Sequence, residues 1–244
     1  HPVFNEVIER FKAIELECGL EHNPYLSQFK RLLDKDTSLD EVVALGEKMS
    51  AMILAAYLGY TFVDAKDVVF FDASGKVDEQ LTYSKIKEAY EQYQTIVIPG
   101  FYGTQANGDI KIFSRGGSDI SGAIAAAALD ADLYENWTDV SGVLMADPRI
   151  IKYAKSIVKM DFAELREMAF MGASVLHESS IRPIKEKNIP LQIRNTNEPT
   201  HPGTQVSGHI EEEGDTEHFI TGMSGLKDFT VISIIVVEIS KTPL

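Results

Sequence analysis

The feature of this sequence that most constrains its fold is an alternation of short β-branched runs with helical patterns of apolar residues. The clearest run, Thr95-Ile96-Val97-Ile98-Pro99, stops at Gly100. Strands that alternate with helices favour a layered α/β domain with a mainly parallel sheet, so we expect that class. Helices are predicted at 3–18, 26–33, 38–58, 84–93, 118–129, 161–171 and 179–186, and strands at 68–71, 95–99, 109–113, 133–137 and 191–194.

The predicted helix at 38–58 carries its own start and stop signals. Ser38 is a good N-cap, Glu41 follows three residues later as in a capping box, and Gly59 ends the helix. Gly46 interrupts this helix, although an internal glycine costs about 1 kcal/mol relative to alanine. We therefore expect close packing or the approach of a ligand at Gly46.

The totals describe an acidic chain of ordinary apolar content. Its 244 residues, 44% of them apolar, suffice for one large α/β domain or two modest ones. A formal charge of −14 argues against nucleic acid or an anionic membrane surface as the main partner. The single cysteine, Cys18, cannot form an internal disulfide and favours a reducing, cytoplasmic compartment. No apolar run reaches the roughly 18 residues of a transmembrane helix, so we expect no membrane span.

Several common catalytic signatures are missing from the sequence. It has no G-x-x-x-x-G-K-[ST] and no G-x-G-x-x-G, so P-loop and Rossmann interpretations lose their main support. The six histidines show no metal-ligand spacing and follow no G-x-S-x-G signature. A zinc site or a hydrolase triad is therefore weakly supported, and we predict no metal ligands among the side chains.

Two glycine-containing segments follow predicted strands and are candidate binding loops. Pro99-Gly100-Phe101-Tyr102-Gly103 lies at the carboxyl end of a strand, where open α/β sheets bind ligands; the alternative is an ordinary turn. Ser114-Arg115-Gly116-Gly117-Ser118-Asp119 opens a helix whose N–H groups and dipole favour an anion. Arg115 could add a contact to a carboxylate or phosphate. The alternative for this second segment is a capping loop with Ser118 or Asp119 as N-cap.

Two further places could bind charged groups. In the polar segment 137–149, Thr138 and Asp139 could hydrogen-bond a nucleotide and Arg149 could neutralise phosphate, whereas the alternative is a long loop with Asx turns. Glu47, inside the helix at 38–58, could bind an ammonium group, although a solvated helix carboxylate is the commoner case.

Six blocks taken together resemble the aspartate kinases, within the amino acid kinase superfamily. They occur in the same order and with similar spacing, and they cover about residues 1–210. The blocks are Leu45-Gly46-Glu47-Lys48-Met49-Ser50, Pro99-Gly100-Phe101-Tyr102-Gly103, Ser114-Arg115-Gly116-Gly117-Ser118-Asp119, Trp137-Thr138-Asp139-Val140-Ser141-Gly142-Val143 with Ala146-Asp147-Pro148-Arg149, Met168-Ala169-Phe170-Met171-Gly172-Ala173 with Val175-Leu176-His177, and Ile189-Pro190-Leu191-Gln192-Ile193-Arg194-Asn195-Thr196.

The resemblance implies a three-layer αβα sandwich and a reaction. ATP, with Mg²⁺, would phosphorylate the side-chain carboxylate of L-aspartate to 4-phospho-L-aspartate, the first step of lysine, threonine and methionine biosynthesis. Glu47 would hold the amino group of aspartate, Phe101 would line its pocket, and Arg115 would grip its α-carboxylate.

The resemblance assigns further roles around these three residues. Gly116, Gly117 and Ser118 would lie near the bound aspartate. Asp119 would organise the reacting end, partly by orienting a lysine, and is the expected catalytic residue together with Arg115. The nucleotide-binding residues implied by the family pattern are Thr138, Asp139, Leu144, Arg149, Ser174 and Val175.

The chain departs from the family pattern at three points. The family opens with a motif of the type Lys-Phe-Gly-Gly-Ser, whose lysine contacts the phosphates, and no such motif occurs here. We therefore expect residues upstream of His1 and no activity without them. Ser174 stands where a lysine often follows Gly-Ala, and Leu144 replaces the usual tyrosine, which leaves that nucleotide contact apolar.

The acidic stretch 211–217 suggests a boundary between a catalytic domain at 1–213 and a segment at 214–244. Strand patterns at 219–222 and 229–239 resemble the start of an ACT-type α+β regulatory domain, which implies a feedback amino acid, lysine or threonine, and a homodimer or higher oligomer. Two alternatives stay open. The chain could be a related kinase acting on glutamate or acetylglutamate, or a non-catalytic relative that binds an effector.

Overall fold

A computed structural model describes residues 2–20, 37–170, 176, 178–208, 221–223 and 225. The predicted helix at 26–33, the nucleotide-binding residues Ser174 and Val175, and the strand pattern at 229–239 lie outside the described residues. Within the pattern at 219–222, the described residues Thr221 and Gly222 are not part of a strand.

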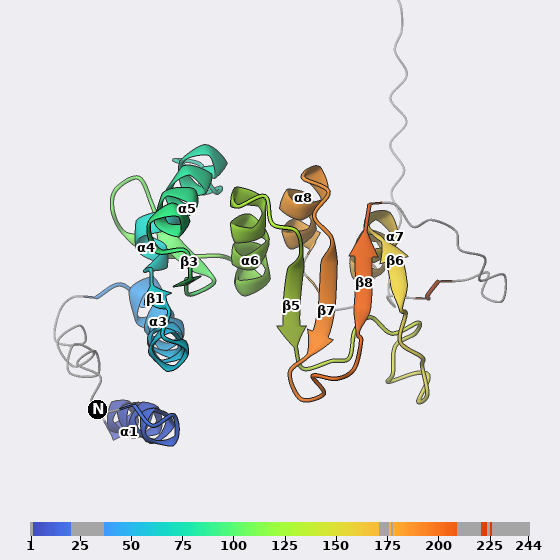
Figure 1. The fold of residues 1–244 in the computed structure, drawn as a ribbon, viewed down its shortest axis with the longest axis horizontal. Coiled ribbons are helices and arrows are strands. Elements are labelled where there is room, and N and C mark those ends of the chain that lie inside the picture. Colours follow the sequence, from blue (N-terminus) through green and yellow to red (C-terminus); the bar gives the residue numbers. More distant parts are fainter. Residues whose placement is uncertain are drawn as a thin grey trace, which may run out of the picture.

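The described helices and strands alternate along much of the chain, as expected (Figure 1). In chain order they are α1 (Pro2–Glu17), α3 (Leu39–Leu58), β1 (Thr61–Phe62), α4 (Ala65–Val68), α5 (Glu79–Tyr93), β2 (Ile96–Val97), β3 (Tyr102–Thr104), β4 (Ile110–Ile112), α6 (Gly117–Ala128), β5 (Tyr134–Thr138), β6 (Lys159–Asp161), α7 (Phe162–Phe170), α8 (Glu178–Glu186), β7 (Leu191–Asn195) and β8 (Thr204–Ser207).

Parallel pairing predominates among the described strands, which confirms the α/β class. β1 pairs with β2, β5 with β7 and β6 with β8 in parallel, whereas β3–β4 and β7–β8 are antiparallel. The largest sheet has the order β5-β7-β8-β6. Buried residues of α7 and α8 share one apolar cluster with β7 and β8, so these helices cover a face of that sheet.

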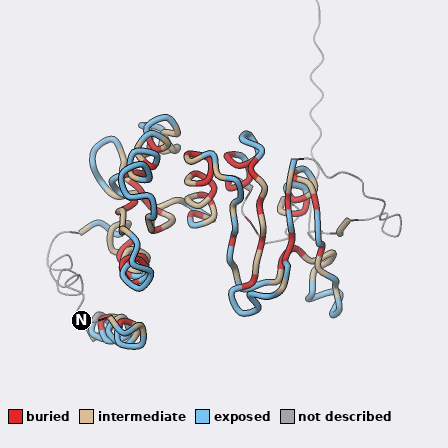
Figure 2. The backbone as a smooth tube through the Cα atoms, in the orientation of Figure 1, coloured by how far each residue is buried: buried red, intermediate tan, exposed pale blue. Residues whose placement is uncertain are grey.

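Helix α6 lies between two groups of elements in Figure 1: the group with α4, α5 and β3, and the large sheet with α7 and α8. Its buried residues pack in both. Ala123 and Ala126 belong to the cluster over the large sheet, whereas Ile120 and Ile124 belong to the cluster around α4, α5 and β3. Figure 2 shows this helix as largely buried. Small side chains on α6 therefore allow close packing from two sides.

The sequence signals around α3 are confirmed, apart from the expectation at Gly46. Ser38 Oγ accepts a hydrogen bond from the Glu41 N–H at 3.2 Å, and Gly59 adopts the left-handed conformation with φ 69°. A Cβ added at Gly46 would meet nothing within 4 Å, so the expected close packing there is wrong. Approach of a ligand at Gly46 stays a prediction.

The strand predicted at 68–71 is wrong. Residues Ala65–Val68 form the short helix α4, capped by Asp64, and the next residues make only single bridges: Phe70 with Thr104 and Phe71 with Val77. The apolar residues 68–71 are β-prone, but the Asp64 cap begins a helical turn first. The strands β1, β3, β6 and β8 were not predicted, because segments of two to four residues give no measurable periodicity of their own. Strands β2 and β4 are equally short, but they lie within the longer β-prone runs at 95–99 and 109–113.

None of the described helices has the length and apolar character needed to cross a membrane.

Candidate functional site

The loop that contains Phe101 packs directly against the start of α6. The Phe101 N–H donates a hydrogen bond to Ser121 Oγ at 3.0 Å, and the Phe101 carbonyl accepts one from the Phe113 N–H at 2.8 Å. Phe101 has φ 57°, an uncommon backbone conformation for a residue with a side chain. The surrounding contacts hold that conformation, as is typical of binding sites.

Glycines make this close approach possible. A Cβ at Gly117 would lie 2.5 Å from the Cβ of Phe101 and 2.8 Å from that of Phe113. A Cβ at Gly100 would lie 3.1 Å from the Cα of Ser118. The two glycine-containing segments that the sequence singled out are therefore in contact.

The start of α6 has no side-chain cap. Its N-cap is Gly116, with φ 58° and no side-chain hydrogen bond, so the alternative of Ser118 or Asp119 as N-cap is wrong. The first N–H groups of a helix lack intrahelical partners, and within the described part of the chain no side chain caps them here. Arg115 and Ser118 are exposed beside this end, so the segment can accept an anion.

Asp119 is tied to strand β5 rather than to its own helix end. Its Oδ1 accepts a hydrogen bond from Asn136 Nδ2 at 3.0 Å, and its carbonyl accepts one from the Tyr134 hydroxyl at 3.2 Å. Burial raises the pKa of Tyr134 to about 12, so the phenol keeps its proton and can donate. Among the described residues Asp119 forms no salt bridge, and its expected role in orienting a lysine stays a prediction.

Sequence reasoning missed Tyr134 and Asn136. The signal that could have found them is the alternation along β5, in which Tyr134, Asn136 and Thr138 point to the same face of the strand. Gly122 allows the tyrosine to approach α6, because a Cβ there would lie 2.5 Å from its hydroxyl. The face of β5 thus links Asp119 to Thr138.

Thr138 lies at the carboxyl end of β5, the edge where parallel sheets bind ligands. Its backbone carbonyl accepts hydrogen bonds from the N–H of Thr196 at 2.8 Å and from the hydroxyl of the same residue at 3.0 Å. The Thr138 hydroxyl donates to Asp139 Oδ1 at 3.3 Å, and Asp139 is exposed. The backbone here is fixed while the carboxylate of Asp139 faces solvent.

The loop after Asp139 is held against β7 and β8. The Ser141 hydroxyl donates to Glu198 Oε2 at 2.8 Å and accepts from Asn195 Nδ2 at the same distance. The Val143 N–H donates to the buried Thr204 hydroxyl at 2.8 Å. Leu144, which follows, is half-buried and bridges Ser156.

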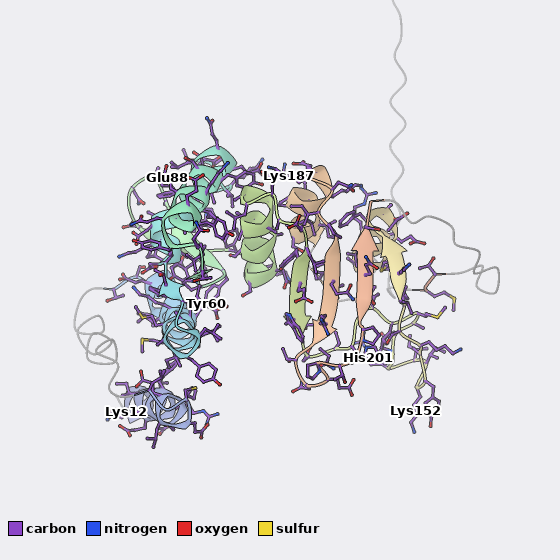
Figure 3. The ribbon with its side chains drawn as sticks, in the orientation of Figure 1. Lys12, Tyr60, Glu88, Lys152, Lys187 and His201 are labelled. Carbon is purple, nitrogen blue, oxygen red and sulfur yellow. The ribbon has the colours of Figure 1, made fainter. Side chains whose placement is uncertain are left out.

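Arg149 stands apart from the other predicted site residues. Its guanidinium makes a two-pronged contact with Asp147, with Nε 3.0 Å from Oδ1 and Nη2 2.6 Å from Oδ2. Hydrogen bonds from Arg149 lower the pKa of Asp147. The Arg149 side chain is 83% exposed. Figure 3 labels Lys152, three residues further on, at the outer end of this loop.

Glu47 is half-buried on α3, and among the described residues it has no ion pair or side-chain hydrogen bond. Its neighbour Lys48 binds the carboxylate of Asp64 at 2.6 Å. Asp64 also accepts a hydrogen bond from the hydroxyl of Tyr102 at 2.7 Å. Sequence reasoning missed this group because Tyr102 lies 38 residues from Asp64 along the chain and further still from Lys48.

The described residues contain no group of three or more His, Cys, Asp or Glu side chains placed to hold a metal ion. The structure thus brings together Phe101, the segment 116–119 and, through β5, Thr138, whereas it does not join Glu47 or Arg149 to them by any hydrogen bond or ion pair within the described part of the chain.

Comparison with known proteins places this geometry in a family. The model of the amino acid kinase family matches residues 3–195. Aspartokinase 3 of Bacillus subtilis is 34% identical over 93% of this chain and 53% of its own length. The chain thus spans about half the length of that relative.

Solved structures agree with that match. The aspartate kinase of Clostridium acetobutylicum superposes with a TM-score of 0.78 at 46% identity, over 86% of this chain and 48% of that one. E. coli aspartokinase III superposes with TM-scores of 0.67 in its complex with aspartate and ADP and 0.63 in its complex with lysine and aspartate. The complex with aspartate and ADP is 26% identical over 86% of this chain and 47% of that chain. The complex with lysine and aspartate is 28% identical over 86% of this chain and 48% of that chain. These structures confirm the expected αβα fold.

Proposed function

This chain belongs to the amino acid kinase family, and from that premise we propose that the whole protein transfers the γ-phosphoryl group of ATP to the side-chain carboxylate of L-aspartate. The products are 4-phospho-L-aspartate and ADP. The relatives named aspartokinase and the E. coli complex with aspartate and ADP support this substrate pair.

The reaction needs positioning more than acid–base chemistry. An oxygen of the β-carboxylate forms a bond to the γ-phosphorus, and the bond from that phosphorus to the β,γ-bridging oxygen breaks, leaving ADP. The attacking carboxylate is already anionic, so no proton has to be removed. Catalysis then rests on alignment of the reactants and on neutralisation of the phosphoryl charge.

The aspartate site in this proposal lies between the Phe101 loop and the start of α6. The α-carboxylate binds Arg115 and the first N–H groups of α6, those of Gly117 and Ser118, because a helix start without a side-chain cap favours an anion. Phe101 lines the pocket. Glu47 binds the ammonium group, which its lack of a protein cation within the described residues leaves it free to do.

ATP lies along the carboxyl end of β5 in this proposal, with contacts from Thr138, Asp139, Leu144 and Arg149. Ser174 and Val175 complete the nucleotide site in the family pattern. Mg²⁺ arrives with ATP, and it is commonly held by phosphates, waters and one or two carboxylates rather than by an all-protein cage. When bound, it neutralises charge on the phosphates.

The single observation that carries the proposal is the hydrogen bond between Asp119 and Asn136. It fixes the start of α6 beside the strand that ends at Thr138. The segments proposed to hold the acceptor and the nucleotide therefore meet at Asp119, as phosphoryl transfer between two bound substrates requires.

The proposal extends to organisation and regulation. Residues 1–213 form the catalytic domain, and 214–244 begin a regulatory segment of ACT type. Lysine is the favoured feedback amino acid, supported by the complex of E. coli aspartokinase III with lysine and aspartate, and threonine is the second candidate. The protein acts as a homodimer or higher homo-oligomer in the cytoplasm.

The test is ADP release by the full-length protein with MgATP and, in turn, L-aspartate, L-glutamate, N-acetyl-L-glutamate or no acceptor. We expect turnover with aspartate only, and a loss of about 10²–10³-fold in kcat/KM for Arg115→Ala and Asp119→Ala. Arg182→Ala and Asp130→Ala, which remove exposed ion-pairing side chains, serve as matched controls. Turnover with another acid would refute the substrate, and no turnover from folded protein would favour an effector-binding relative.

A further inference from the structure

We propose that Asp64 is a positioning residue for the acceptor site: it joins the helix that carries Glu47 to the strand that follows Phe101. This inference rests on the proposed function and adds to it three residues, Asp64, Lys48 and Tyr102, that contact no substrate themselves. It predicts that they determine the affinity for L-aspartate and leave that for ATP unchanged.

Asp64 lies where three elements meet. One carboxylate oxygen, Oδ2, binds Lys48 Nζ of α3 at 2.6 Å. The other, Oδ1, accepts a hydrogen bond from the Tyr102 hydroxyl of β3 at 2.7 Å and one from the Lys66 N–H, in the first turn of α4, at 3.2 Å. Both oxygens of a carboxylate that is only 8% exposed are therefore occupied by groups from different parts of the chain.

Through Tyr102, the contact with Asp64 also restrains the backbone of Phe101. The Tyr102 side chain is 1% exposed, and its hydroxyl reaches Asp64, so the residue next to Phe101 cannot rotate freely. Phe101 itself is held at φ 57° between this contact and the Ser121 hydroxyl. A backbone in that conformation reverts to a commoner one when its neighbours allow it.

Through Lys48, the contact with Asp64 also restrains the turn of α3 that carries Glu47. The two residues are adjacent on α3, and the ion pair fixes this turn of the helix against β3 and α4. Glu47 has no ion pair of its own among the described residues, so the position of its carboxylate follows from that of the helix. One buried carboxylate thus sets the relative placement of the groups proposed to hold the ammonium and the side chain of aspartate.

We expect the protein to fold without the charge of Asp64. The Lys48 side chain is 25% exposed, so its ammonium group can turn to water instead of staying buried without a partner. Asparagine at position 64 can still accept from the Tyr102 hydroxyl. Tyr102→Phe is the milder variant, because it keeps the ring, the carboxylate and the ion pair.

The experiment measures steady-state ADP release by the full-length protein for Asp64→Asn, Tyr102→Phe and Lys48→Met. We expect KM for L-aspartate to rise about 10-fold or more, with kcat and KM for MgATP changed by less than about twofold. Combining Asp64→Asn with Lys48→Met should add little to the larger single effect, because both remove the same ion pair. Asp130→Asn and Tyr93→Phe, on exposed side chains, are the matched controls.

Two results would overturn the inference. One is an unchanged KM for aspartate in folded Tyr102→Phe and Lys48→Met. The other is an equal rise of KM for L-aspartate and KM for MgATP, which indicates a general loosening of the fold. Failure of the proposed function looks different: the unmodified protein itself would show no aspartate-dependent turnover. If Asp64→Asn does not fold, as judged by circular dichroism, the other two variants decide.

Discussion

Single side chains connect the candidate site to the rest of the molecule. Asn136 and Tyr134 bind the two ends of Asp119, its carboxylate and its carbonyl, from one face of β5. The tyrosine hydroxyl also accepts a hydrogen bond from Asn136 at 3.1 Å, so the three residues form one network. Ionisation of Tyr134 would remove the proton that it donates to the Asp119 carbonyl.

Tyr134 therefore gives a prediction about alkaline pH. Its folded pKa of about 12 exceeds the ordinary 10.0, chiefly through burial. The native state thus holds the proton more tightly, and this stabilisation is complete below pH 10 and lost as pH rises toward 12. We expect the free energy of unfolding of Tyr134→Phe to fall less steeply above pH 10 than that of the unmodified protein, by up to about 1.4 kcal/mol per pH unit.

Urea unfolding at pH 8.5, 10 and 11 measures the difference. Tyr93→Phe, on an exposed ring, is the control. Parallel pH profiles for Tyr134→Phe and the unmodified protein would show that Tyr134 ionises normally.

At the scale of elements, α3 contains residues that stabilise the helix and one residue, Gly46, that does not. Its cap, apolar face and C-terminal glycine all agree with the structure. Gly46 does not fit that pattern, because it lowers helix propensity and no packing requires it. For this glycine, which has open space beside it and lies next to Glu47, the approach of substrate stays a prediction.

Gly46→Ala tests this explanation. We expect the variant to gain about 0.5–1 kcal/mol in free energy of unfolding from helix propensity. If aspartate approaches α3 closely at this point, KM for aspartate should also rise. The reciprocal change Ala56→Gly, at an exposed position of the same helix, should cost a similar free energy without altering KM. Stabilisation with unchanged KM would show that Gly46 has no role in binding.

At the scale of the whole molecule, α6 contributes buried side chains to two of the three apolar clusters among the described residues. Ala123 faces the cluster over the large sheet, and Ile120 and Ile124 face the other. The same helix presents its first turn to the candidate site. The packing of these two clusters and the geometry of the candidate site are therefore coupled through α6.

Ala123→Leu should reveal this coupling. Ala123 has no exposed surface, so three extra carbon atoms force α6 away from its neighbours at a cost of about 1–3 kcal/mol. We expect a lower free energy of unfolding in urea and higher KM values for both substrates. Ala56→Leu, the same change on an exposed helix surface, should stay within about 0.5 kcal/mol of the unmodified protein. Equal stability of the two variants would contradict the central position of α6.

The sequence by itself determined the α/β class, most helices and the two contacting glycine segments. These features are local: caps, periodicity and backbone freedom depend on residues within a few positions of one another. The composition of the segment 114–119 by itself also predicts an anion site.

Only the tertiary structure decided which partners these residues have. The pairing of Asp119 with Asn136, of Asp64 with Lys48 and Tyr102, and of Phe70 with Thr104 joins positions distant along the chain. A short polar side chain can satisfy its hydrogen bonds in many ways, and burial against a particular neighbour selects one of them. The chemistry of the site was therefore present in the sequence, whereas its geometry came from packing.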